Sequence, residues 1–290
     1  IAVERKLNKN FDDFFAKILL SIGYILSFRT LRKKLGLQRA EFAASGAAPI
    51  APEVLKFFMS IGVPLFEAYG MTENCAYATS NSPENIKIGT VGIPAHGVEL
   101  KLADDGEILI RSGGVFKGYF KDDQATSETI DKDGWLHTGD VGIYEGDFVK
   151  IIDRKRDIII TSGGKNVSPS EIENKIKVSP FIKEAIVIGD RRKFLSVLIG
   201  IEFDTVSNWA LRKNIPHTTY RDLSEKQEVK DLVWKEISKA NELTSSLEVR
   251  EFRMIPKELD HEEGELTATQ KVKRNVLIDQ FSDLIEEMYS

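Results

Sequence analysis

The loop Tyr69–Glu73 gathers, within one turn, the chemical groups that a nucleotide requires. The ring of Tyr69 can stack on a base, and Gly70 lets the backbone approach a ligand closely. Thr72 can donate a hydrogen bond to a phosphate oxygen, and the carboxylate of Glu73 is a hard oxygen ligand of the kind that Mg²⁺ prefers. Turns often contain these residue types, so an ordinary turn explains the loop equally well when it is considered alone.

A second candidate site lies in the stretch 133–164, which also has the composition of a domain boundary. A glycine-bracketed loop ends in Asp140, a hairpin is predicted through Gly146, and a charged run follows at 153–157. A further strand is predicted over 157–162, before the turn Gly163-Gly164. The residues before this stretch have the pattern of an α/β domain, and those after it have the pattern of a smaller α+β domain.

Residues 41–73 have the pattern of a strand, a helix and a second strand. We predict strands at 41–45 and 63–68, joined by a helix that begins at Pro52 and ends at Gly62. A crossover of this length implies that the two strands are parallel. The loops 46–49 and 69–73 then follow the carboxyl ends of both strands, at the edge where open α/β sheets bind ligands.

The remaining elements complete the predicted fold. Residues 86–150 predict short strands and turns, among them a strand at 107–111 and a hairpin over 143–150. Ser168 begins a capping box, and its helix should bury Ile172 and Ile176. Strands at 184–188 and 195–201 and helices around 229–233 and 277–288 follow. The predicted class is α/β: the end of a large parallel-sheet domain with a small β-rich subdomain, then a small α+β C-terminal domain.

The composition restricts the possible partners and compartments. With 42% hydrophobic residues among 290, the chain can bury a sizeable core, and two domains are expected. A net charge of −5 argues against nucleic acid as a main partner. The single cysteine, Cys75, excludes an intramolecular disulfide and suits a reducing, cytoplasmic compartment; we expect its thiol to be neutral and buried or half-buried. The four histidines form no zinc-type cluster with it.

An apolar segment over residues 11–28 contains Asp12, Asp13 and Lys17, and its apolar residues recur at helical spacing. This pattern predicts an amphipathic helix rather than a membrane span. The helix either packs on a protein core or contacts a membrane at its cytoplasmic face. Because the first residue is isoleucine and no domain start is evident, we expect this chain to be the C-terminal part of a longer one.

Six segments, in this order, resemble the signature motifs of the adenylate-forming enzymes, the superfamily of acyl- and aryl-CoA ligases, amino-acid adenylation domains and firefly luciferases. They are SGAAP (45–49), YGMTE (69–73), GVFKGYFKDDQAT (114–126), WLHTGD (135–140), DRKRDIIITSGGKNVSPSEIE (153–173) and LTATQKVKR (266–274). The run at 133–157 is especially similar to the fatty acyl-CoA synthetase signature. The resemblance implies a long-chain fatty-acid–CoA ligase that uses ATP, Mg²⁺ and coenzyme A.

The resemblance implies a role for each matching residue of the nucleotide site. Asp140 would accept hydrogen bonds from the two ribose hydroxyls, and Arg154 would add a donor to the ribose. Tyr69 would pack on the adenine. The remaining nucleotide contacts would come from Gly46, Ala47, Ala48, Gly70, Met71 and Thr72.

The resemblance places the catalytic groups in both halves of the chain. Thr72 would contact the α-phosphate, Glu73 would hold Mg²⁺, and Lys271 would touch the carboxylate and the phosphate during adenylation. A fatty carboxylate that attacks a phosphate brings two anions together, so a metal ion and an ammonium group are the natural stabilisers.

The same resemblance implies a large domain at 1–152, a hinge at 153–157 that includes Asp153, and a small mobile domain at 158–290. The family's pivot aligns with Arg156. Gly163 and Gly164 would line the channel for the pantetheine of coenzyme A, where absent side chains permit a close backbone approach. These glycines can also serve a turn between a strand and a helix, and both interpretations can hold together.

Several alternatives remain open. The family's glycine/serine/threonine-rich loop for the β- and γ-phosphates is absent from these 290 residues, so we do not expect this chain to complete adenylation alone. The alternatives are an acyl-AMP ligase that delivers to a carrier protein and a non-catalytic fragment or degenerate homologue. Peripheral membrane contact and a homodimer stay open as partners. Trp135, Trp209 and Trp234 are expected to be packing residues, and the run 191–193 is either a solvated turn or a contact to the phosphates of coenzyme A.

Overall fold

The computed structural model describes residues 22–23, 27–243, 248–267 and 271–290. The chain divides into two compact units, Ile1–Arg156 and Asp157–Ser290, and each is described here by itself. Most of the amphipathic helix predicted over 11–28 lies outside the described residues. Among the helices that the structure describes, none is long and apolar enough to cross a membrane.

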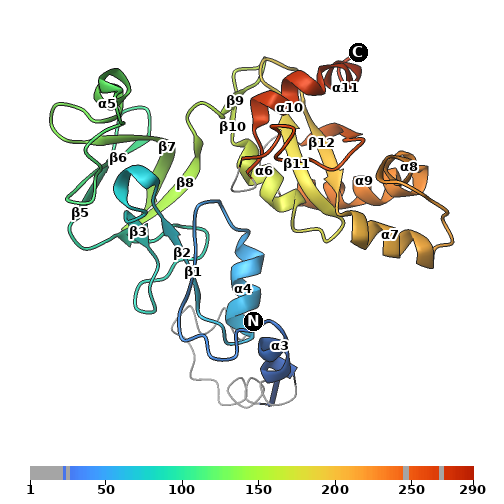
Figure 1. The fold of residues 1–290 in the computed structure, drawn as a ribbon, viewed down its shortest axis with the longest axis horizontal. Coiled ribbons are helices and arrows are strands. Elements are labelled where there is room, and N and C mark those ends of the chain that lie inside the picture. Colours follow the sequence, from blue (N-terminus) through green and yellow to red (C-terminus); the bar gives the residue numbers. More distant parts are fainter. Residues whose placement is uncertain (1–21, 24–26, 244–247, 268–270) are drawn as a thin grey trace. The chain divides into compact units, whose positions relative to one another are not determined.

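The first unit contains a four-stranded sheet in the order β1-β2-β3-β4 (Figure 1). Strands β1 (Ala43–Ser45) and β2 (Leu65–Tyr69) are parallel and are joined by helix α4 (Pro52–Ser60), as the sequence predicts. Pro52 is at the start of α4 and Gly62, with φ +84°, follows its end. The short strands β3 (Thr79–Ser80) and β4 (Ile93–Pro94) add to this sheet in antiparallel fashion. Helix α3 (Arg29–Lys34) precedes it.

A second, antiparallel sheet in this unit has the order β5-β6-β7-β8. Its strands are β5 (Val98–Leu102), β6 (Glu107–Ser112), β7 (Leu136–Glu145) and β8 (Phe148–Arg154), and helix α5 (Asp123–Thr129) lies between β6 and β7 in the chain. Tyr69 and Ala78 from the first sheet share one core with Ile108, Leu136 and Val149 from the second. This common core fixes the two sheets against each other, so residues of β2 and β7 can form one site.

The second unit is a three-stranded sheet covered by helices on both faces. Strand β12 (Leu195–Ile201) lies between β11 (Ile182–Ile188), to which it is antiparallel, and β13 (Val249–Met254), to which it is parallel. Side chains alternate along a strand, so Val187 and Ile199 enter one core while Ile186 and Leu198 enter the other. Full burial of an aliphatic side chain of this size stabilises a fold by about 1.5–3 kcal/mol.

The helices of this unit are divided between the two faces. The first core receives residues of α6 (Pro169–Ile176), α7 (Phe203–Arg212), α8 (Tyr220–Glu225) and α9 (Gln227–Glu242), and the second receives residues of α10 (Arg274–Gln280) and α11 (Ser282–Glu287). Ile172 and Ile176 are buried, and the hydroxyl of Ser168 accepts the N–H of Glu171, as predicted.

Two predicted elements differ from the structure. The strand expected over 157–162 is limited to β9 (Ile159–Ile160), which forms a small hairpin with β10 (Asn166–Val167) because the chain turns back at residues 161–165. The helix expected over 277–288 is two helices, since Phe281 adopts φ −106° and ψ 25° between α10 and α11. Its apolar side chains still face the second core.

Candidate nucleotide-binding site

A buried tyrosine–aspartate pair lies where the two sheets of the first unit meet. The hydroxyl of Tyr69, at the end of β2, donates a 2.6 Å hydrogen bond to Oδ2 of Asp140, in β7. Each residue exposes only 9% of its surface. Burial and the neighbouring Asp140 carboxylate raise the pKa of Tyr69 well above its ordinary value, so the phenol remains the donor.

The other oxygen of Asp140 faces a cation. Nε of Arg154 lies 3.5 Å from Oδ1, and the two residues are direct partners in the β7–β8 register. The Arg154 side chain is 53% exposed whereas that of Asp140 is 12% exposed, so the pair runs from the core toward solvent. Each carboxylate oxygen can accept more than one hydrogen bond, which leaves acceptor capacity for the hydroxyls of a ribose.

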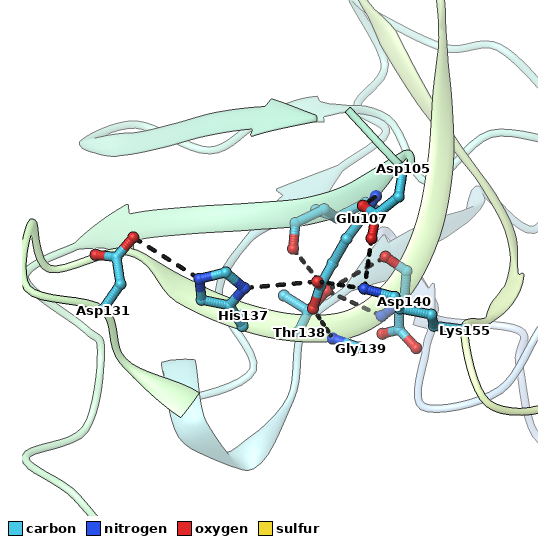
Figure 2. A network of polar contacts seen from close by, with 9 residues as sticks. Asp105, Glu107, Asp131, His137, Thr138, Gly139, Asp140 and Lys155 are labelled. Carbon is cyan, nitrogen blue, oxygen red and sulfur yellow. Dashed lines mark hydrogen bonds and ion pairs between the residues drawn. The ribbon is translucent and has the colours of Figure 1, made fainter. Parts of the chain in front are cut away.

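The backbone beside Asp140 is held by Glu107, a residue that sequence reasoning missed (Figure 2). Oε1 of Glu107 accepts the N–H of Gly139 at 2.9 Å, and its Oε2 lies 3.3 Å from Nζ of Lys155. Lys155 also donates its backbone N–H to the carbonyl of Gly139 at 2.8 Å, and its ammonium lies 2.5 Å from Asp105. Glu107 thus holds the N–H of Gly139, and Lys155, the residue after Arg154, holds its carbonyl oxygen.

His137 and Thr138 complete this network. Nδ1 of His137 lies 3.5 Å from Glu107 and its Nε2 lies 3.7 Å from Asp131, so the imidazole bridges two carboxylates (Figure 2). Thr138 donates to the carbonyl of Ile108 at 2.7 Å and accepts the N–H of Asp140 at 3.1 Å. The contacts of His137 are those of a residue that shapes the loop.

Replacing Glu107 with alanine should loosen the turn at Gly139. The part-buried N–H of Gly139 would lose its acceptor, and such a loss costs about 1–3 kcal/mol. Amide hydrogen exchange over residues 136–142 should therefore accelerate by about 10-fold or more. Glu99→Ala is the matched control, because Glu99 pairs with Arg111 on the surface with 62% of its side chain exposed. Equal exchange rates in wild type and Glu107→Ala would contradict the role of Glu107.

The loop after β2 presents Thr72 and Glu73 on a short 3₁₀ helix, Thr72–Asn74. The loop is tightly closed: a Cβ at Gly70 would lie 2.3 Å from the backbone of Ala76, so only glycine fits there. The N–H of Met71 donates to Oδ1 of Asn74 at 2.9 Å. Thr72 is exposed and Glu73 is half-buried, so both side chains can reach a ligand.

The prediction for Cys75 was wrong, because its thiol is exposed rather than buried or half-buried. Cys75 ends the 3₁₀ helix at φ 56°, and Ala76 follows at φ 55°. Two successive left-handed residues turn the chain sharply and carry the side chain of Cys75 out of the core.

The loop 46–49 follows β1 beside the end of β2, at the carboxyl edge of the parallel pair, as predicted. Ala47 adopts φ 67°, and a Cβ at Gly46 would lie 2.9 Å from the carbonyl oxygen of Ala68. The nearby Glu67 is 9% exposed, and its burial raises its pKa to about 7 despite hydrogen bonds from the backbone of Ile50 and Gly89. This buried carboxyl group could not be predicted from the sequence, because strand alternation does not indicate which polar residues are covered.

The residues around Glu73 fit a magnesium ion that arrives with a nucleotide. Mg²⁺ is usually held by one or two carboxylates together with substrate phosphates. In the described part of the chain, no three His, Cys, Asp or Glu residues converge on a possible metal site. The single carboxylate of Glu73, in the loop after β2, therefore suits a metal ion whose other ligands are phosphate oxygens.

The predicted site residues of the second unit are Gly163, Gly164 and Lys271. Gly164, at φ +75°, closes the β9–β10 hairpin, whereas a Cβ at Gly163 would meet no atom closer than 4.0 Å. The local fold therefore requires glycine at position 164 but not at 163. Lys271 donates its N–H to Oγ1 of Thr267 at 3.0 Å and accepts the N–H of Thr267 at its carbonyl oxygen at 2.8 Å, and its side chain is exposed.

The remaining noticeable residues are packing or surface groups. Trp135 lies between Lys101 and Arg111, Trp234 stacks on Phe252, and Trp209 packs on the first core of its unit. These contacts agree with the packing role predicted for the three tryptophans. In the turn 191–193, Arg191 is 93% exposed, but Arg192 pairs with Glu286 and lies over the ring of Tyr289.

Two family models match most of the chain. The model described as AMP-binding enzyme matches residues 15–120, and the model described as AMP-binding enzyme C-terminal domain matches residues 156–290. Together with the site geometry, these matches define the class: the chain belongs to the AMP-binding, adenylate-forming enzymes.

Individual relatives agree with this class. A long-chain-fatty-acid–CoA ligase of Mycobacterium tuberculosis is 37% identical over 268 residues, which are 91% of this chain and 44% of that protein. A long-chain-fatty-acid–CoA ligase of Gallus gallus is 32% identical over 290 aligned positions, which cover 91% of this chain and 38% of that protein. The chain thus spans less than half the length of these relatives.

Solved structures have the same fold. The adenylation domain of a carboxylate reductase from Mycobacterium chelonae matches with a TM-score of 0.71 at 23% identity, covering 93% of this chain and 41% of that one. The O-succinylbenzoate coenzyme A synthetase of Bacillus subtilis, solved with ATP and magnesium, matches with a TM-score of 0.60 at 26% identity, covering 81% of this chain and 46% of that one. The predicted α/β fold class is confirmed.

Proposed function

We propose that this chain belongs to a long-chain fatty-acid–CoA ligase, in which it provides the ribose-binding side of the nucleotide site and the mobile C-terminal domain. The observation that carries the proposal is the buried carboxylate of Asp140, with Tyr69 at 2.6 Å on one oxygen and Arg154 at 3.5 Å from the other. A carboxylate held in this way suits the hydroxyls of a ribose. The neighbouring loop, with Thr72 and Glu73, suits the phosphate of the same nucleotide and its metal ion.

In the first half-reaction, a carboxylate oxygen of the fatty acid attacks the α-phosphorus of ATP, and the bond to pyrophosphate breaks. Negative charge on the phosphate oxygens increases in the transition state, so donors placed at these oxygens accelerate the step. Thr72 donates to an α-phosphate oxygen, Asp140 and Tyr69 hold the nucleoside, and Lys271 bridges the two reacting anions. Mg²⁺, when bound through Glu73 and the phosphates, supplies further positive charge.

In the second half-reaction, the thiolate of coenzyme A attacks the acyl carbon, and AMP leaves with the oxygen that joined it to the acyl group. The enzyme needs no nucleophile of its own, so this step requires no role for Cys75. Gly163, where the local fold has room for a side chain, would leave space for the pantetheine arm.

Both half-reactions would use one nucleotide site, with the small domain at 158–290 turning about the hinge 153–157 relative to the large domain at 1–152. The boundary between the two compact units, after Arg156, supports a pivot in this segment. Lys155 is anchored to the first unit by Asp105 and Glu107, which favours Arg156 over earlier residues as the pivot.

The names of the relatives support long-chain fatty acids as the acids that are activated. The test uses the full-length protein that contains this chain. Pyrophosphate release from ATP should depend on a fatty acid, and saturated acids of increasing length should be compared. Adding coenzyme A should then yield the acyl thioester and AMP.

Three results would contradict the proposal. Release of pyrophosphate that does not depend on any acid would exclude an acid ligase. Pyrophosphate release with an acid, followed by transfer to a carrier-protein phosphopantetheine but not to coenzyme A, would instead establish an acyl-AMP ligase. Absence of any ATP turnover in a folded full-length protein would favour a non-catalytic homologue.

A further inference from the structure

The side chain of Glu73 is held by a residue from a distant segment of the first unit. The hydroxyl of Tyr119 donates a 2.8 Å hydrogen bond to Oε1 of Glu73, across a sequence separation of 46 residues. The backbone N–H of Phe116 donates to the carbonyl oxygen of Glu73 at 2.8 Å. The segment between Phe116 and Tyr119 therefore fixes both the main chain and the carboxylate of Glu73.

The turn that carries Tyr119 is itself firmly built. Its N–H donates to Oγ1 of Thr126 at 2.9 Å, and that hydroxyl donates to the carbonyl of Asp122 at 2.7 Å. Gly118 adopts φ +142°, and a Cβ at this position would lie 2.6 Å from Cγ2 of Thr126. Because Gly118 has no side chain, the backbone before Tyr119 can lie close to Thr126 of helix α5, and this helix thereby fixes the position of Tyr119.

Packing against an aromatic ring further restricts Tyr119. The ring of Phe116 meets that of Tyr119 edge-on, with 4.9 Å between the centroids. Tyr119 nevertheless remains 38% exposed, so its hydrogen bond to Glu73 lies at the surface. A surface hydrogen bond of this kind contributes little to the stability of the fold, and its main effect is to orient the Glu73 carboxylate.

We propose that Tyr119 is a positioning residue for the metal ligand Glu73: its hydroxyl holds Oε1 and leaves Oε2 for the magnesium ion that accompanies the nucleotide. This proposal rests on the role of Glu73 in the proposed function. Within the described residues, Oε2 of Glu73 has no hydrogen bond or ion pair. A carboxylate that accepts a hydrogen bond on one oxygen is preset in orientation, so metal binding does not have to order it.

The expected effect follows from the general behaviour of groups that orient metal ligands. Removing such a group costs about 10- to 100-fold in metal affinity. Because Tyr119 is partly exposed, we expect the lower end of this range, about 10-fold, for Tyr119→Phe. This substitution keeps the ring contact with Phe116 and removes only the hydroxyl.

The test is a titration of the full-length protein with Mn²⁺, which substitutes for Mg²⁺ and whose free concentration is measured by electron paramagnetic resonance. The titration is done with a non-hydrolysable ATP analogue at saturation. Tyr119→Phe should weaken Mn²⁺ binding about 10-fold, while affinity for AMP without metal stays unchanged. Tyr144→Phe is the matched control, because the hydroxyl of this exposed tyrosine donates to the carbonyl of Leu100.

Repeating the substitution in a protein that lacks the Glu73 carboxylate separates an effect on the orientation of Glu73 from a general structural effect of Tyr119→Phe. In a Glu73→Gln protein, which lacks the charged ligand, adding Tyr119→Phe should change Mn²⁺ affinity less than 2-fold, since paired effects of coupled residues are not additive. Thr126→Val, which removes the hydroxyl beneath Tyr119 without touching the carboxylate, should weaken Mn²⁺ binding in the same direction.

The outcomes are distinguishable. Wild-type and Tyr119→Phe proteins with equal Mn²⁺ affinity would overturn the role of Tyr119 and leave the proposed function intact. Tighter binding by Tyr119→Phe would also overturn it, because the phenol would then compete with the metal. Absence of nucleotide-dependent Mn²⁺ binding in the wild-type protein would overturn the role of Glu73 and the proposed function with it.

Discussion

Replacing Lys271 with alanine should slow formation of the acyl-adenylate about 100-fold or more in the full-length protein. The reason is electrostatic, because this ammonium offsets the repulsion between the attacking carboxylate and the α-phosphate. Lys271 is exposed, and its hydrogen bonds with Thr267 are made by its own backbone N–H and carbonyl, so the loss of its side chain should not disturb the fold. Acid-dependent pyrophosphate release in a single turnover measures this step directly.

The reaction of Lys271→Ala with preformed acyl-AMP separates the two half-reactions. Thioester formation from acyl-AMP and coenzyme A should proceed within a few-fold of the wild-type rate, since no anion attacks phosphate in that step. Lys273→Ala is the matched control, because Lys273 is also exposed and lies two positions further along the chain. An undiminished adenylation rate in Lys271→Ala would remove this lysine from the catalytic machinery.

Replacing Asp140 with asparagine should weaken AMP binding by about 10- to 100-fold, because a hydrogen bond to a charged group contributes about 1.5–3 kcal/mol. Asparagine retains one acceptor oxygen for the Tyr69 hydroxyl but no longer offers a second carboxylate oxygen to the ribose and Arg154. Isothermal titration with AMP measures the loss, and Asp147→Asn, at an exposed position of the β7–β8 turn, is the control.

Deoxynucleotides test whether the effect of Asp140→Asn arises at the ribose. Wild-type protein should prefer AMP over its 2′-deoxy and 3′-deoxy analogues, and Asp140→Asn should lose most of that preference. If the variant discriminates among the three nucleotides as well as the wild type does, then Asp140 does not contact the ribose and weaker binding has another cause.

The parallel unit β1–α4–β2 could be predicted because its signals are local. Pro52 begins the helix, Gly62 ends it, and apolar runs on either side form the strands. The same holds for the N-terminus of α6, which Ser168 caps. The short motifs identified Tyr69 and Asp140 as separate candidates, and the structure brings them together.

The remainder of the site depends on contacts between residues that are distant in the chain. Tyr69 and Asp140 are 71 positions apart, and Glu107 lies 32 positions before Gly139, whose N–H it accepts. Neither Glu107 nor Tyr119 is distinguishable in the sequence from a polar strand end or a surface aromatic. The exposure of Cys75 likewise depends on its positive φ, which non-glycine residues seldom adopt and which no local pattern predicted.

Transfer of an isotope from the acid to the nucleotide tests the central claim, that a fatty acid is activated as its adenylate. The full-length protein is incubated with ATP, coenzyme A and a long-chain fatty acid whose two carboxylate oxygens are ¹⁸O. The ¹⁸O content of the AMP and pyrophosphate is then measured by mass spectrometry. If the carboxylate attacks the α-phosphorus, each AMP formed carries one ¹⁸O and the pyrophosphate carries none. AMP without the label, or ADP as the nucleotide product, would contradict the account.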